Sequence, residues 1–491
     1  MNASYDHNVT EKSHVEDVNL GVEPGVLRTR WLALVAVGVW WCALHPAAPH
    51  LALVSVTMCL IRPFGRPIVR LEVVVLATLV CVLVVVAVRS KSSDDAATRV
   101  EPTSFTGSVR VVDDPQPFSN STRLIIDVDG RRCEVWARRY SIRARVASVS
   151  AGEYLTVSGH VEQLSRSRYE RVRWQHVLCE FRVDWVGDVT EGSSAAQASN
   201  RVRSLVTKVG DHIGGERGAL FRGLVIGDDR DQPLEMLQRF RSGGLSHLTA
   251  VSGQNVALIL AAATPLIRRL APKTQVVTSL LVIGWFVLIT RSEPSILRAG
   301  LMAAIAVIAA SKGRRIEPIR ALSIAVICLI LIDPLLAASV GFHLSVGATF
   351  GVMAIGPIVT SCLPFPSKIA VPVGVTLGAQ IGVLLPALLV FQRAPLVALP
   401  ANLLAVPVAG LVMMVGMPIA ILVALVPSVA RVMVPPLELG VWWVDAVARV
   451  AAACEPSSQW PGVLVSLLIS SCVAVVAASR KFGRLRAKHG G

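Results

Sequence analysis

Gly243-Gly-Leu-Ser-His-Leu-Thr-Ala-Val-Ser-Gly-Gln-Asn-Val256 is the stretch that decides the fold. It places glycines and polar side chains at the start of a hydrophobic segment that continues to Ala263. Lipid offers no hydrogen-bond partners, so polar groups at membrane depth must line a cavity or contact other parts of the protein. An ionisable residue at that depth is a functional candidate. The stretch therefore predicts a membrane segment with a polar site at one end.

The composition is that of a protein that crosses a membrane several times. The chain has 491 residues, of which 53% are hydrophobic and 16% are charged. Several apolar runs approach or exceed the roughly 18 residues that span a bilayer. The net charge of +15 has two interpretations. Arginine and lysine mark cytoplasmic loops, or the chain attracts a polyanion such as nucleic acid.

We expect about twelve spans, three before a polar region and nine after it. Arginines before the first run and between the second and third are expected to be cytoplasmic, which sends the chain outward after residue 88. The later basic clusters and both termini then also lie in the cytoplasm, which predicts a multi-pass membrane protein. The expected spans are 31–45, 50–61, 71–88, 247–268, 275–290, 295–310, 319–332, 335–358, 369–391, 396–426, 432–453 and 461–479.

The polar region alternates apolar and polar residues, with turn signals such as Asp129-Gly130 and Ala151-Gly152. This period of two predicts short strands in a small OB-like β-barrel outside the cytoplasm. The expected strands are 107–112, 123–129, 133–138, 143–149, 154–161 and 177–186. The predicted organisation is a disordered cytoplasmic tail (1–27), N-terminal transmembrane helices (28–89), the OB-like domain (90–190), a linker (191–215), a transmembrane channel domain (216–480) and a basic cytoplasmic tail (481–491).

Cys133 and Cys179 are the only cysteines in the polar region. Disulfides form outside the cytoplasm, and both residues fall in expected strands, so a bridge that closes the barrel is one interpretation. The other is a pair of buried thiols, because free cysteine is often a core residue. No cysteine or histidine spacing in the sequence indicates a metal site, and we expect no cofactor.

Several blocks, in order, resemble the ComEC-type competence proteins. After Gly227-Asp228 comes the extended motif that begins at Phe240 and ends at Val256. The later blocks are Glu293-Pro-Ser-Ile-Leu-Arg-Ala-Gly300, Ser339-Val-Gly-Phe-His-Leu-Ser345, Ala379-Gln-Ile-Gly382, Leu385-Pro386 and Pro400-Ala-Asn-Leu-Leu-Ala-Val-Pro407. The resemblance covers roughly residues 216–479, and the preceding helices and barrel resemble the usual N-terminal domain of that family.

The resemblance implies an inner-membrane channel that admits single-stranded DNA during natural transformation. The implied partners are single-stranded DNA, the membrane, a separate extracytoplasmic DNA receptor and a cytoplasmic ATP-driven translocase, since the chain has no P-loop of its own. Homo-oligomerisation stays open. The chain departs from the family pattern in two ways: we expect it to be a short form without the C-terminal metallo-β-lactamase-like domain, and Gln254-Asn255 replace an apolar residue and a histidine.

Polar residues in the apolar segments are the candidates for a DNA path. The alternative is that they join helices, because serine, asparagine and glutamine hydrogen-bond across membrane helices. Arg298 is costly to bury, and it requires either an anionic partner such as Glu293 or a wet cavity. The candidates are Asp228, His247, Ser252, Gly253, Gln254, Asn255, Ser295, Arg298, His343, Ser345, Gln380 and Asn402.

The expected barrel carries a cluster of arginines among aromatic residues. OB-folds bind single strands through a basic groove and aromatic stacking, so these arginines are candidate DNA contacts. The alternative is an ordinary exposed surface, since the region also holds nearly balancing acids. The candidates are Arg131, Arg132, Arg138, Arg139, Arg143 and Arg145.

Three functions are compatible with these observations. We expect the DNA channel, which is not an enzyme and has no catalytic residue. A secondary transporter or channel for another anionic solute or envelope precursor is the first alternative. A membrane-embedded hydrolase built on His247 and Ser252 is the second, although a catalytic triad needs a third group.

Overall fold

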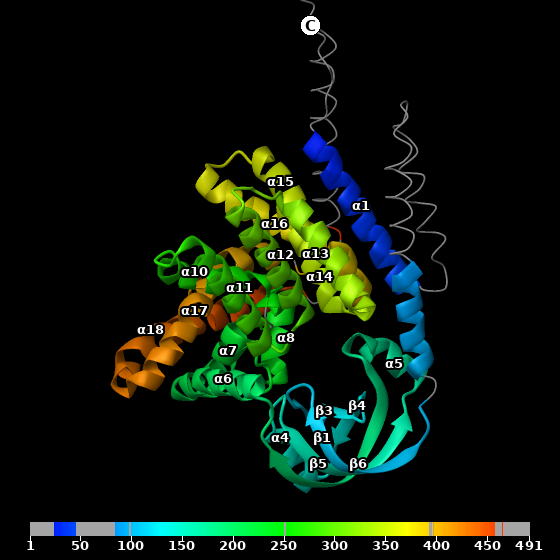
Figure 1. Ribbon diagram of the computed structural model, residues 1–491. Coiled ribbons are helices and arrows are strands. Elements are labelled where there is room, and N and C mark those ends of the chain that lie inside the picture. Colours follow the sequence, from blue (N-terminus) through cyan, green and yellow to red (C-terminus); the bar gives the residue numbers. More distant parts are fainter. Residues whose placement is uncertain are drawn as a thin grey trace, which may run out of the picture.

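The protein's structure, a computed structural model, describes residues 24–45, 84–97, 100–249, 252–391, 395, 397–456 and 464. It is mostly helical, with one sheet region toward the N-terminus that lies below the helices in Figure 1. The expected span 50–61 and the expected tail 481–491 lie outside the described residues. So do most of the expected spans 71–88 and 461–479 and most of the expected tail 1–27.

Five described segments are long and apolar enough to cross a membrane, which makes the chain a membrane protein. Their surfaces are apolar nearly all round, as expected for helices that face lipid. Exposed leucines such as Leu385, Leu389 and Leu425 lie on them. The five are α11 (Pro272–Ile289), α12 (Pro294–Ser311), Val340–Cys362, which contains α14 (Val340–Phe350) and α15 (Gly356–Cys362), α16 (Ser367–Phe391) and α17 (Ala398–Leu425).

The total of twelve spans stays a prediction. Two more apolar helices, α10 (Gly253–Ile267) and α13 (Pro318–Ile332), have 15 residues each. On the N-terminal side, α1 (Pro24–Leu44) packs against α13, and a further helix covers 84–97. Helix α18 (Ala430–Cys454) replaces the expected span 432–453, but it carries charged residues such as Glu438 and Asp445 and is not among the five.

Proline sets the start of several of these helices. Pro272, Pro294 and Pro318 each occupy the first position of α11, α12 and α13. The first helical residue has no intrahelical use for its N–H, so proline costs nothing there and its fixed φ favours the helix. Pro294 starts α12 soon after α11 ends at Ile289, so the connection between the two helices is short. This connection contains Arg291 and Glu293, which are part of the site described below.

The sheet region holds six strands around a compact apolar core. They are β1 (Thr103–Val111), β2 (Gln116–Phe118), β3 (Ser121–Val128), β4 (Arg131–Ala137), β5 (Tyr154–Gln163) and β6 (Val177–Thr190). The order is β1-β5-β6-β4-β3-β2, and β1 also pairs with β3, so five of the strands form a closed ring of pairings. Only β4 and β6 run parallel among these pairs. Leu124, Ile126, Leu155 and Phe181 fill the centre.

Two sequence predictions in this region are wrong. Residues 143–149 were expected as a strand, but they belong largely to α4 (Tyr140–Ala147), whose buried residues are Ile142 and Val146. A spacing of four suits one face of a helix, and alternation over so few residues cannot exclude it. The expected linker 191–215 is instead mostly α6 (Ser194–Ile213), whose first turn is capped by the hydroxyl of Ser193.

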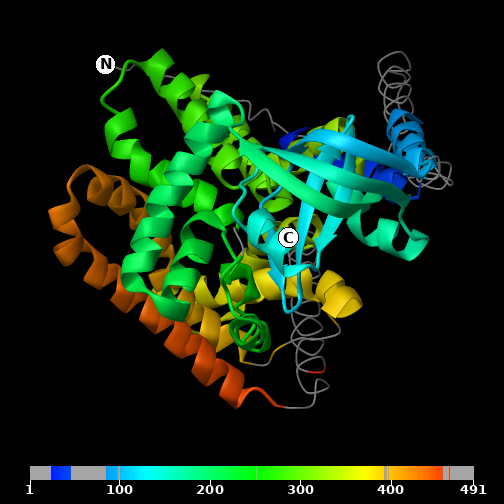
Figure 2. The same ribbon diagram turned by 90° about the horizontal axis from the view of Figure 1, so that it is seen from below.

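Helix α6 returns the chain from the sheet to the helical layer, where it packs against α7 (Gly215–Ile226) and α17. Glycine allows the closest approach, because a Cβ on Gly218 would lie 2.2 Å from the carbonyl oxygen of Gly210. Viewed from the sheet side, the sheet covers one part of the helical layer, and the orange α18 runs along the opposite edge (Figure 2).

Glycines also join the segment Val340–Cys362 to α16. A Cβ on Gly351 would lie 2.0 Å from the carbonyl oxygen of Gly378, and one on Gly382 would lie 2.1 Å from that of Gly347. The two backbones are therefore in direct contact, as small residues permit between membrane helices.

Replacing Gly351 by valine is expected to prevent this contact. Three added carbon atoms cannot fit against a carbonyl oxygen, so the helices must separate and the loss of stability should be about 2 kcal/mol or more. The thermal midpoint of the purified protein measures the effect. Gly284→Ala is the matched control, since nothing lies within 4 Å of its added Cβ, and an unchanged midpoint for Gly351→Val would contradict the packing.

Candidate functional site

Arg298 lies at the centre of the strongest candidate site. Its side chain is buried in the second turn of α12, with 5% of the residue exposed. The Nε atom donates a hydrogen bond to Ser345 Oγ at 2.9 Å, and Nη1 donates to Met302 Sδ at 3.2 Å. Within the described part of the chain no carboxylate lies within 4.0 Å of the guanidinium. Burying such a charge costs about 2.5–3.5 kcal/mol on insertion scales.

Of the two alternatives for Arg298, an ion pair with Glu293 is not formed. Glu293 precedes α12 at the capping position, whereas Arg298 lies more than one turn inside the helix. The guanidinium is turned instead toward the start of α10. A Cβ on Gly253 would lie 2.4 Å from Arg298 Nη2, so only a glycine fits there without displacing the arginine.

The other residues of the same motif divide into two groups. His247 and Gln254 are exposed, although they lie in the helical layer. Asn255 is buried and joins helices: its Nδ2 donates to the Leu224 carbonyl at 3.2 Å, and its Oδ1 accepts from Ser252 Oγ at 3.2 Å. His247 makes no hydrogen bond with Ser252 in the described residues, so the geometry expected of a Ser–His pair is not present.

Four further candidates lie elsewhere. His343 Nε2 lies 2.6 Å from the Ala337 carbonyl oxygen and 3.2 Å from Trp40 Nε1, so it belongs to the contact with α1 and not to the surroundings of Arg298. Asn402 donates to the Ala398 carbonyl at 2.7 Å. Gln380 is on α16 with a buried Nε2 that has no partner among the described atoms. Ser295 is on α12, one turn before Arg298.

Asp228 belongs to a buried network of charges that the sequence did not predict. Its carboxylate binds Arg230 at 2.6 Å and Arg203 of α6 at 3.4 Å. Arg203 also binds Asp114 at 2.9 Å, and Asp114 binds Arg291 at 2.8 Å. Asp114 follows β1, so this network joins the sheet to α6 and to the connection between α11 and α12. One signal in the sequence could have indicated this network: Arg203 lies on the same side of the amphipathic helix α6 as the buried Val206 and Val209.

The pKa values reflect this arrangement. Burial by itself raises the pKa of Asp114, but the guanidiniums of Arg203 and Arg291 outweigh it and hold the pKa below its usual range. Among the described residues, Glu293 has no such cationic partner. Burial and then the negative charges of Asp113 and Asp229 raise its pKa to about 7.

Glu293 also lines a polar cavity of about 390 Å³ between the sheet and the start of α14. Cationic, anionic and aromatic groups all face this cavity, so it is wet and mixed in charge. Its lining includes Asp113, Gln116, Arg123, Arg171, Trp174, Glu293 and Ser339.

Glu293→Gln is expected to remove part of the pH dependence of stability. The folded pKa of about 7 lies above the ordinary value of 4.5, so the folded state binds the proton more tightly. Stability then falls as the pH rises from about 4.5 to about 7 and is level above that range. Thermal midpoints across this range should flatten in Glu293→Gln and keep their slope in Glu191→Gln, an exposed control. If the thermal midpoint of Glu293→Gln kept the same pH slope as that of the wild type, the raised pKa would not belong to Glu293.

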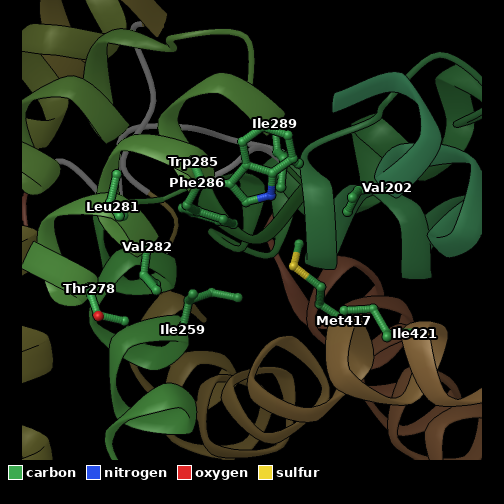
Figure 3. A pocket seen from close by; sticks show the side chains of 10 residues that line it. All are labelled: Val202, Ile259, Thr278, Leu281, Val282, Trp285, Phe286, Ile289, Met417 and Ile421. Carbon is green, nitrogen blue, oxygen red and sulfur yellow. The ribbon is translucent and has the colours of Figure 1, made fainter. Parts of the chain in front are cut away.

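A second cavity, of about 340 Å³, is apolar and lies between α6, α10, α11 and α17 (Figure 3). Trp285, Phe286 and Met417 point into it, and Thr278 is the one hydroxyl-bearing residue of its lining. An apolar lining of this kind does not favour a charged ligand, in contrast to the surroundings of Arg298.

The six arginines of the sheet region do not form one patch. Arg131 and Arg132 begin β4, and Arg132 Nη1 donates to the Gln175 carbonyl at 3.0 Å. The other four follow the opposite end of β4, where Arg145 Nη1 donates to the Val186 carbonyl at 2.7 Å. They are Arg138, Arg139, Arg143 and Arg145. The two groups lie about 20 Å apart along the strand.

A different basic and aromatic surface lies across β2, β3 and β4. The Trp136 ring stands 5.1 Å from the half-exposed Phe118 and 4.7 Å from the Arg168 guanidinium. Glu134 binds Arg168 at 2.7 Å and also pairs with Arg123. The sequence analysis expected arginines among aromatic residues but did not predict this grouping, because Arg168 is far from Trp136 along the chain.

Cys133 and Cys179 stand opposite each other on the parallel strands β4 and β6, and their sulfur atoms are bonded. Both residues are fully buried. The bridge closes a loop of 46 residues, which in the chain-entropy account stabilises a domain by about 4 kcal/mol.

Comparison with known proteins agrees with the sequence blocks around this site. The chain is 23% identical over 313 residues to ComE operon protein 3 of Bacillus subtilis (strain 168), a match that covers 61% of this chain and 40% of that relative. No solved structure matches the chain significantly. The family described as competence protein matches residues 224–482, which include Arg298 and its neighbours and more than half of the chain. The protein therefore belongs to the competence protein family.

Proposed function

We propose that the protein takes part in DNA uptake as a channel of the bacterial inner membrane that admits single-stranded DNA. The observation that carries the proposal is the buried guanidinium of Arg298, which has no anionic partner in the described chain and lies among membrane helices. A protein places an unpaired cation at that depth for an anionic cargo to meet. Membership in the competence protein family supports the same cargo.

The sheet supports contact with a single strand outside the membrane. Its closed ring of pairings, its parallel β4–β6 pair and the helix α4 between β4 and β5 suit an OB-like barrel. OB-folds bind single strands on a basic surface with exposed aromatic rings, and Phe118, Trp136 and Arg168 provide such a surface.

In this proposal both termini are cytoplasmic and the sheet lies on the outer side, where the disulfide Cys133–Cys179 is stable. The protein has no catalytic role of its own and needs no cofactor. A separate receptor delivers the DNA outside, and a separate ATP-driven translocase acts in the cytoplasm.

The test is a clean deletion in a transformable host, complemented with the wild-type gene. Labelled DNA is followed from the surface-bound fraction to the nuclease-protected cytoplasmic fraction. We expect surface binding to persist and the protected fraction to disappear. Unchanged import would reject the channel, and a transport screen for another anionic solute or envelope precursor would then identify the cargo.

A further inference from the structure

We propose that Arg298 and the first turn of α10 together bind one phosphodiester group of the passing strand. This inference rests on the proposed function and specifies the contact. It starts from the guanidinium itself, which is 5% exposed and uses Nε and Nη1 on Ser345 and Met302. Its Nη2 atom has no hydrogen-bond acceptor among the described residues and points toward Gly253.

The start of α10 contributes the second half of the site. The helix has 15 residues, and no side chain caps its first turn. The hydroxyl of Ser252, which stands at the capping position, donates to Asn255 Oδ1 instead. The first N–H groups of a helix have no intrahelical acceptor and carry a partial positive charge, so they bind phosphate oxygens well.

Gly253 brings the two halves together. A Cβ at this position would lie 2.4 Å from Arg298 Nη2 and 3.0 Å from the Ala299 side chain. Because Gly253 has no side chain, the guanidinium lies directly against the first turn of α10. Ser345 and Met302 act as positioning residues, because they hold two guanidinium nitrogens and leave the third available.

The chemistry of the site selects an oxyanion. Guanidinium N–H and backbone N–H groups are all donors, and charge-assisted hydrogen bonds to a phosphate are the strong ones. A phosphodiester occurs both in the DNA backbone and in a lipid headgroup. We assign the site to the DNA backbone because the exposed His247 and Gln254 belong to the same motif, whereas the apolar faces of the helices are where lipid packs.

Photo-crosslinking tests the site in the full-length protein in nanodiscs. A photoreactive amino acid replaces Ala257, an exposed residue one turn beyond Gly253, and the probe is a labelled single-stranded oligonucleotide. We expect Arg298→Gln and Gly253→Ala each to lower the yield about tenfold or more, the loss that corresponds to one charged hydrogen bond. Gly253→Ala keeps the charge and fills the space. Gly284→Ala, in open surroundings, should keep the full yield.

The same protein is then offered an oligonucleotide with neutral methylphosphonate linkages, and the yield should fall to that of Arg298→Gln. Equal yields for both backbones would overturn the proposal, and so would a full yield from a folded Gly253→Ala protein. Crosslinks to lipid in DNA-free nanodiscs that DNA cannot displace would assign the site to a headgroup and overturn it too. Loss of DNA import in the deletion strain together with equal crosslinking yields for both backbones would support the channel but reject the phosphodiester site. Normal DNA import in the deletion strain would reject the proposed function itself.

Discussion

Arg298→Ala is expected to abolish DNA import while DNA binding at the cell surface stays at the wild-type level. The substitution removes the one buried cation described between α10, α12 and α14. The nuclease-protected fraction should fall to the background of the deletion strain. In the proposed function a separate receptor captures the DNA first, so the surface-bound fraction should not change.

The matched control is Arg314→Ala, which removes an exposed arginine just beyond the C-terminal end of α12. It should import DNA normally. Immunoblotting of the membrane fraction establishes that both variants insert to the same level. Normal import by a stably inserted Arg298→Ala protein would contradict the role of the arginine.

Asp114→Ala is expected to have the largest effect on stability. Removing this carboxylate leaves Arg203 and Arg291 without their shared partner, and a broken buried ion pair costs about 3–5 kcal/mol. The depressed pKa keeps Asp114 charged through neutral and mildly acidic pH, so the loss should be the same across that range.

Thermal midpoints and limited proteolysis near residues 191–193, between β6 and α6, measure this loss. Asp188→Ala, which removes an exposed carboxylate of the same domain, should behave as wild type. An Asp114→Ala protein with an unchanged midpoint and unchanged cleavage would refute the structural role of the network.

Local patterns in the sequence predicted a large part of the fold. Period-two alternation located the strands at 107–112, 123–129, 133–138, 154–161 and 177–186, because successive side chains of a strand point to opposite faces of the sheet. Long apolar runs located the five segments that can cross a membrane. The segment 143–149 was missed because Ile142 and Val146 satisfy a helix equally well.

Contacts between distant residues were beyond such patterns. The cost of burying Arg298 could be recognised from its apolar surroundings, but its true neighbours Ser345 and Gly253 lie on other helices. Asp114 and Arg203 are 89 positions apart, and nothing local links an aspartate after a strand to an arginine on a later helix. His343 looked like a path residue because sequence cannot tell which side of α14 meets α1.

The glycine contact between Val340–Cys362 and α16 has a mechanical consequence. Two helices whose backbones touch cannot slide or tilt independently, so we expect this pair to move as one rigid unit. If the protein is the proposed channel, its passage should open where helices meet through side chains and not between these two. The contact between α10 and α12, where Arg298 lies against Gly253, is such a place.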